Sequence, residues 1–190
     1  MASMTSCSLH FRADRGITLV ETMVTVSILV ILLMVAVPAY KSTIDGNRRA
    51  TYANELLEDL TLARSEAIKR NKKVVVCAST SGTACLGLFP PGDWTSGWIM
   101  YVDSNGNGSL DLGETVLRTH GALKMPTGWA ATHNLAPYTV PFRPTGEITG
   151  IGAGGFSICI GNGLNACSAG NVNYSSVVGT AAGRMRIDSK

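Results

Sequence analysis

The sequence predicts an α+β protein in which one long N-terminal helix is followed by a small, antiparallel, β-rich head. Residues 17–37 form an apolar run, and leucine and alanine then recur at helical spacing through residues 47–70. Beyond residue 73, short runs of β-branched and aromatic residues alternate with stretches rich in glycine, serine and asparagine, which is typical of strands and turns. One long helix followed by several short strands indicates an α+β arrangement.

The apolar run 17–37 has the properties of a membrane-spanning helix. With a rise of about 1.5 Å per residue, it is long enough to cross a bilayer core of about 30 Å. Glu21 is its single charged residue, and an ionisable group in lipid is costly and marks a candidate functional position. Arg12 and Arg15 precede the run, and positive charge favours a cytoplasmic location for that side. Pro38 follows, and we expect it to bend the helix without ending it.

This junction resembles the signature of type IV prepilins. In that family a short basic leader ends in glycine, the next residue becomes the N-methylated N-terminus, and a glutamate stands at the fifth mature position. Gly16, Ile17 and Glu21 occupy these places, and Pro38 falls at the family's helix-bending proline. The family most often begins its mature chain with phenylalanine, so Ile17 is a departure. An ordinary signal anchor with a chance glutamate is the alternative.

The resemblance implies a type IV pilin fold with four parts: a cleaved leader (1–16), a transmembrane and assembly helix (17–38), an amphipathic helix packed on the head (39–72), and the β-rich head (73–190). It implies cleavage by a prepilin peptidase, an inner-membrane location with the head in the periplasm, and later assembly with major and minor pilins in an extracellular pilus. Glu21 would pair with the free amine of Ile17 on a neighbouring subunit, because a carboxylate in hydrocarbon needs a cation or becomes protonated.

Several short segments of the head are predicted strands. They are residues 74–77, 97–102, 114–118, 156–160 and 183–187, together with a hairpin formed by 140–143 and 147–148. The cationic run 69–73 is expected to end the preceding helix. The stretch 122–137 carries no predicted element.

A narrower resemblance is to the GspH/FimT group of minor pilins and pseudopilins. It rests on the helix end 62–71 followed by Val76-Cys77, on Gly97-Trp98 through Arg118, and on the closing Gly-Arg-x-Arg of residues 183–186. These segments are spread over the mature chain from end to end.

Four cysteines follow the leader, whereas Cys7 lies within it; the four are Cys77, Cys85, Cys159 and Cys167. An even set downstream of an export signal indicates two disulfides in an oxidising compartment. Of the three connectivities, Cys77–Cys85 with Cys159–Cys167 is preferred, because both pairs have the spacing of a hairpin-like turn. Zinc is the alternative, but the C-x2-C spacing is absent and no histidine is nearby in the sequence.

Residues 103–114 fit the calcium-loop pattern D-x-[DN]-x-[DN]-G-x5-E. The candidate oxygen ligands are Asp103, Asn105, Asn107, Asp111 and Glu114. An EF-hand needs flanking helices, whereas the flanks here are predicted strands, and Asx turns with glycine suit a hairpin loop without metal. A metal-free hairpin is therefore favoured over calcium, and no other cofactor is expected.

The Gly-Arg-x-Arg element of residues 183–186 indicates binding of phosphates. Residues two apart in a strand share a face, so Arg184 and Arg186 are predicted to point the same way, and adjacent guanidiniums suit a row of phosphates. Lys190 extends this patch. The net charge of +3 says little about partners, but basic residues outnumber acidic ones beyond residue 115. The element, with Gly183, resembles the DNA-binding element of FimT-type minor pilins, which implies non-specific binding of double-stranded DNA for uptake in natural transformation.

Other functions stay open at this point. In one alternative the two arginines serve solubility or subunit packing, and the protein is a structural tip or priming minor pilin, or a type II secretion pseudopilin, without DNA binding. A calcium-dependent adhesin that presents residues 103–114 is a further class. The sequence shows no nucleophile–base pair or paired-carboxylate site, so we predict no catalytic residue and no enzymatic activity.

Overall fold

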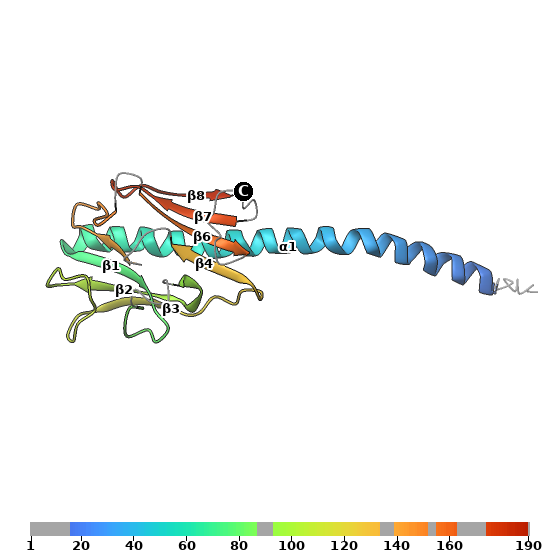
Figure 1. Ribbon diagram of the computed structural model, residues 1–190, viewed down its shortest axis with the longest axis horizontal. Coiled ribbons are helices and arrows are strands. Elements are labelled where there is room, and N and C mark those ends of the chain that lie inside the picture. Colours follow the sequence, from blue (N-terminus) through green and yellow to red (C-terminus); the bar gives the residue numbers. More distant parts are fainter. Residues whose placement is uncertain (1–15, 87–92, 134–138, 152–154, 163–173, 190) are drawn as a thin grey trace, which may run out of the picture. The chain divides into compact units, whose positions relative to one another are not determined.

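The computed structural model describes residues 16–86, 93–133, 139–151, 155–162 and 174–189. In this part of the chain lie one long helix, α1 (Leu19–Arg70), a short 3-10 helix, η1 (Trp94–Ser96), and eight strands (Figure 1). The chain divides into two compact units, Met1–Thr43 and Ile44–Lys190.

The first unit contains the apolar part of α1. The Thr18 hydroxyl precedes the helix and accepts a hydrogen bond from the Glu21 amide at 3.3 Å, which caps the first turn. The helix continues through Pro38, as predicted. Its large apolar side chains between residues 17 and 37 are exposed, and the helix is long and apolar enough to cross a membrane. Such a surface needs lipid or other helices around it.

In the second unit, α1 buries one face. The buried side chains recur at intervals of three or four residues and are Ala53, Leu56, Leu60, Ala63 and Ala67. This spacing places them on one side of a helix with 3.6 residues per turn. The predicted amphipathic helix is therefore confirmed.

The helix ends in a Schellman cap. Asn71 follows the last helical residue with a left-handed φ of 51°. Its amide donates to the Ile68 carbonyl, and the Lys72 amide donates to the Ala67 carbonyl, both at 3.3 Å. The helix therefore ends where the cationic run 69–73 predicted, and the left-handed backbone at Asn71 also contributes to this end.

The strands of the second unit form two four-stranded antiparallel sheets. The first sheet has the order β3-β2-β1-β5 and consists of β1 (Lys73–Ala78), β2 (Trp98–Asp103), β3 (Val116–His120) and β5 (Thr139–Phe142). The second has the order β4-β6-β7-β8 and consists of β4 (Trp129–His133), β6 (Phe156–Asn162), β7 (Tyr174–Gly179) and β8 (Met185–Ser189). Strand β8, which carries one of the two candidate arginines, is therefore an edge strand.

Most of these strands were predictable, and two were not. Strands β1, β2, β3, β6 and β8 match predicted segments to within two residues at each end, and β5 with the Phe142–Ile148 bridge forms the predicted hairpin. Strand β4 falls in the stretch that carried no predicted element, and β7 was also missed. Both contain alanine or serine where a strand usually has larger residues, and these small side chains are buried by packing in the sheet.

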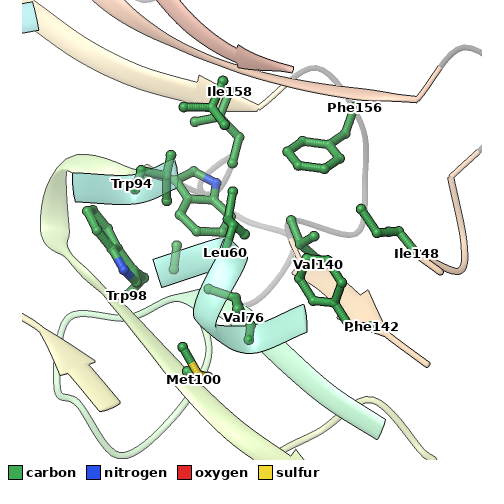
Figure 2. Packing of buried hydrophobic residues seen from close by; sticks show 14 of the residues in the cluster. Leu60, Val76, Trp94, Trp98, Met100, Val140, Phe142, Ile148, Phe156 and Ile158 are labelled. Atoms are coloured by element: carbon green, nitrogen blue, oxygen red, sulfur yellow. The ribbon is translucent and has the colours of Figure 1, made fainter. Parts of the chain in front are cut away.

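One apolar core joins α1 to both sheets. It includes Leu60 from the helix, Val76 and Met100 from the first sheet, and Phe156 and Ile158 from the second (Figure 2). A smaller cluster, Val75, Cys77, Ile99 and Tyr101, lies apart from this core, and Cys85 and Leu110 pack against it. Because side chains alternate across a strand, these residues face the side of the first sheet opposite the main core, so that β1 and β2 are buried on both faces.

Candidate functional site

The Gly-Arg-x-Arg element spans the end of the turn between β7 and β8 and the start of β8. The Gly183 amide donates to the Thr180 carbonyl at 2.8 Å, and the Thr180 amide donates to the Arg184 carbonyl at 2.9 Å. Gly183 has a φ of 75°, and a Cβ placed there would lie 2.1 Å from the Gly146 carbonyl oxygen and 2.9 Å from Arg64 Nε. Close approach of another backbone, together with a left-handed conformation, therefore requires glycine at this position.

This turn lies against two other elements, α1 and the β5 hairpin. Arg64 of α1 donates its Nε hydrogen bond to the Gly146 carbonyl at 3.1 Å, and the Ile148 amide donates to the Ala181 carbonyl at 2.9 Å. The β7–β8 turn, the β5 hairpin and the helix thus meet at one place. An open hollow of about 410 Å³ adjoins them and is lined by Arg143, Glu147, Ile148, Thr149, Gly150, Ala181 and Ala182.

Arg184 and Arg186 both lie in solvent. Between and after them, Met185 and Ile187 are half-buried and pack against the main core. This alternation agrees with the predicted shared face of the two arginines, although β8 begins at Met185, so Arg184 belongs to the turn. The third predicted member of the patch, Lys190, lies outside the described residues.

Arg186 is engaged in an ion pair that was not predicted from the sequence. Its Nε lies 2.9 Å from Asp188 Oδ1, and its Nη2 lies 3.0 Å from Asp188 Oδ2. Hydrogen bonding from Arg186 holds the pKa of the Asp188 carboxyl below its ordinary value. The spacing of two residues on a strand is the sequence signal for this pair, because it puts Asp188 on the same face as Arg186.

The loop 103–114 is organised around an ammonium group. Lys73 Nζ lies 2.8 Å from Asp103 Oδ2 and donates to the Gly106 carbonyl at 3.0 Å. The amides of Gly106 and Gly108 donate to the two oxygens of the same carboxylate at 2.7 and 2.8 Å. Burial acts to raise the pKa of Asp103, but the hydrogen bond from Lys73 and those from the two amides outweigh it, so that this pKa lies below its ordinary value.

The other candidate calcium ligands are hydrogen-bonded within the loop. Asp111 Oδ2 accepts hydrogen bonds from the side-chain amides of Asn105 and Asn107 at 2.7 and 2.6 Å. Glu114 accepts one from the Ser104 amide at 2.7 Å and one from the Asp111 amide at 3.1 Å. Among the described residues, no group of three His, Cys, Asp or Glu side chains is arranged to hold a metal ion.

A disulfide joins Cys77 to Cys85 with a Cα–Cα distance of 5.6 Å, which is the pairing preferred from the sequence. Cys159 is also disulfide-bonded, and its predicted partner Cys167 lies outside the described residues. Tyr101 packs in the small cluster beside Cys85 and donates its hydroxyl hydrogen bond to the Gly108 carbonyl at 2.9 Å. The disulfide loop and the loop 103–114 are thus connected on one face of the first sheet.

A polar network that was not predicted from the sequence links α1 to β2 and β3. The buried carboxylate of Asp59 accepts a hydrogen bond from Trp98 Nε1 at 2.7 Å and pairs with Arg118 Nη1 at 2.9 Å. The His120 ring stacks on Trp98 with centroids 3.9 Å apart, and His120 Nε2 lies 3.6 Å from Glu55 Oε2. These residues lie at the interface between the helix and the first sheet, so we infer that the network stabilises the fold.

A long helix with an exposed apolar N-terminal part, and with a C-terminal part that packs on two antiparallel sheets, defines a pilin-like protein. The model of the family described as type II transport protein GspH matches residues 52–183, and that of the prokaryotic N-terminal methylation motif matches residues 11–37. The chain therefore belongs to the GspH family and is a type IV minor pilin or pseudopilin.

Individual proteins show the same relationship. The chain is 34% identical over 108 residues to the pilin-like protein PilA1 of Thermus thermophilus; this match covers 56% of the chain but only 59% of that relative. The type IV minor pilin FimU of Pseudomonas aeruginosa has a similar fold, with a TM-score of 0.53 and 20% identity over 75% of this chain and 89% of that one. A second crystal form of FimU gives a TM-score of 0.50 at 19% identity, over 73% and 91%.

Membership of this family places the chain among proteins that assemble with other pilins or pseudopilins, in a type IV pilus or in type II secretion. The apolar part of α1 and the methylation motif together indicate a membrane anchor that serves this assembly. The predicted family and the predicted fold class are thereby confirmed.

Proposed function

We propose that this minor pilin binds double-stranded DNA non-specifically through Arg184 and Arg186, for uptake in natural transformation. The observation that supports the proposal most is the exposure of both guanidiniums on a turn and edge strand, where the Ala181 carbonyl of the turn accepts a hydrogen bond from the Ile148 amide. Planar guanidiniums on a rigid support suit backbone phosphates, which are the same in every DNA sequence.

The full chain in neutral detergent, mixed with a labelled DNA duplex, tests this proposal. Contacts with phosphates release counterions, so affinity should fall steeply between low and physiological salt. The double variant Arg184→Gln, Arg186→Gln should abolish binding without changing the circular dichroism spectrum. Arg70→Gln removes an exposed arginine from the end of α1 and is the control that should bind as the unaltered chain does. DNA affinity that survives the double substitution would refute the proposal.

The alternative is a structural tip or priming subunit, or a type II secretion pseudopilin, that does not bind DNA. It is favoured by the description of the matching family as a type II transport protein and by the ion pair that already engages Arg186. In that case deletion of the gene should abolish fibres or secretion, and the purified chain should show no DNA affinity at any salt concentration.

We also propose the route by which the chain reaches the fibre. A prepilin peptidase cleaves after Gly16, Ile17 becomes N-methylated, and the head faces the periplasm until the subunit enters an extracellular pilus. Support comes from the match to the methylation motif and from the position of Glu21 in the first turn of α1. Mass spectrometry of the protein from membranes tests this route, because the mature chain should begin at a methylated Ile17.

A further inference from the structure

The ion pair between Arg186 and Asp188 limits what the candidate DNA-binding element offers to a phosphate. A guanidinium binds an oxyanion best when two of its nitrogens contact two oxygens side by side. In Arg186, the edge formed by Nε and Nη2 already makes two such contacts, with the oxygens of Asp188 at 2.9 and 3.0 Å. The other two-nitrogen edge, formed by Nη1 and Nη2, keeps one hydrogen on each nitrogen, so a phosphate can bind there, but close to the negative charge of Asp188.

We infer that Asp188 competes with DNA phosphate for Arg186, and thereby sets the affinity of the Gly-Arg-x-Arg element for polyanions. The inference rests on the DNA-binding function proposed above. A phosphate that takes the Nε–Nη2 edge must displace the carboxylate, and the displaced carboxylate remains a negative charge close to the bound phosphate.

The exposure of the pair makes this exchange possible. The side chains of Arg186 and Asp188 are 68% and 47% exposed, so neither charge is held in a dry site. Exposed ion pairs contribute little free energy and are screened by salt, so a competing anion can displace them.

The competition also implies selectivity for polyanions. A single small anion that takes the Nε–Nη2 edge of Arg186 gains one set of contacts and must displace Asp188 to obtain it. A nucleic acid that displaces Asp188 once can contact Arg184 as well, because both guanidiniums lie on the exposed side of the same short segment. The element thus favours a row of phosphates over inorganic phosphate or chloride.

Asp188→Asn tests this inference, because asparagine keeps the size of the side chain and removes its charge. The full chain in neutral detergent is titrated against a labelled duplex at several salt concentrations. We expect about three- to tenfold tighter binding at low salt. The slope of log affinity against log salt concentration should also become steeper, by roughly the amount that one additional phosphate contact contributes. Unchanged or weaker binding would overturn the inference, and weaker binding would show that Asp188 orients Arg186 for DNA.

Two further variants separate competition from a general gain of positive charge. Glu58→Gln removes an exposed carboxylate that pairs with Arg118 at 3.2 Å, next to the other sheet, and should change affinity less than about twofold. In an Arg186→Gln background, Asp188→Asn should lose most of its effect, because no guanidinium is left to release. An undiminished gain in that background, or an equal gain from Glu58→Gln, would overturn the inference.

The same titrations distinguish failure of this inference from failure of the proposed function. If Arg184→Gln with Arg186→Gln abolishes binding but Asp188→Asn has no effect, DNA binding stands and the competition does not exist. If the unaltered chain and Asp188→Asn both show no DNA affinity, both proposals are wrong.

Discussion

Gly183 determines how the turn that carries the proposed DNA-binding element packs. Its missing side chain lets the β7–β8 turn approach the Gly146 carbonyl, while Arg64 bonds to the same carbonyl at 3.1 Å. The glycine of the Gly-Arg-x-Arg element therefore has a structural role, and the two arginines carry the charge.

Gly183→Ala should destabilise the protein by about 2–4 kcal/mol, because the new methyl group would meet backbone at 2.1 Å in a left-handed conformation. Gly106→Ala is the matched control, since Gly106 has a φ of 82° but nothing within 4 Å of a built Cβ. That substitution should cost only the conformational term of about 1 kcal/mol. Urea unfolding measures both, and equal losses would contradict the account of the turn.

The lowered pKa of Asp103 should make the free energy of unfolding depend on pH. A carboxyl group with a lowered pKa in the folded state stabilises the fold above its unfolded pKa of about 4. This contribution is lost as the pH falls through the lower, folded pKa. In unfolding experiments from pH 7 downwards, the unaltered chain should exceed Asp103→Asn in stability at neutral pH, and the difference should shrink in acid. A difference that does not depend on pH would contradict this assignment.

At the scale of elements, loop 103–114 shows why a motif match did not settle its chemistry. The calcium pattern takes account only of side chains within one segment. Lys73 lies in β1, and its Nζ is 2.8 Å from Asp103 Oδ2. Sequence spacing within the loop cannot reveal a partner from a different strand. The β1–β2 register, which pairs Lys73 with Asp103, brings the two together.

We propose that this loop closes without calcium, with the Lys73 ammonium as its cation. Millimolar calcium should then give no heat in calorimetry and no shift in melting temperature, because each carboxylate already accepts hydrogen bonds. Lys73→Met should lower the melting temperature by several degrees, since it leaves the buried Asp103 without its counter-charge. A calcium-dependent shift in the unaltered chain would contradict the proposal.

The sequence predicts the elements whose apolar residues recur with a clear period. It predicts less well the features that depend on contacts between residues far apart in the chain. The spacing of Leu56, Leu60 and Ala63 predicts the buried face of α1, and valine-rich runs predict β1. Strands β4 and β7 depend on packing of small residues within a sheet, which local preference does not detect. The arginines of residues 183–186 were predictable as candidates, but the pairing of Arg186 required the structure.

At the scale of the whole molecule, the chain consists of two units with different surfaces. The first exposes an apolar helix suited to lipid or to neighbouring pilin helices, and the second is a closed α+β unit with its own core. The four-part division, in which residues 1–16 are a leader, residues 17–38 and 39–72 divide the helix and residues 73–190 form the head, remains a prediction. The methylation motif matches the first unit, and the GspH family model matches the second.

DNA uptake by cells that produce this protein tests the central claim most directly. Cells whose chromosomal copy carries Arg184→Gln and Arg186→Gln should keep their fibres and lose most uptake of labelled duplex DNA. The control variant Arg70→Gln, which removes a positive charge at the end of α1, should leave uptake intact. Normal uptake with the doubly substituted pilin, shown by immunoblot to be present in the fibres, would contradict DNA binding as the function of this surface.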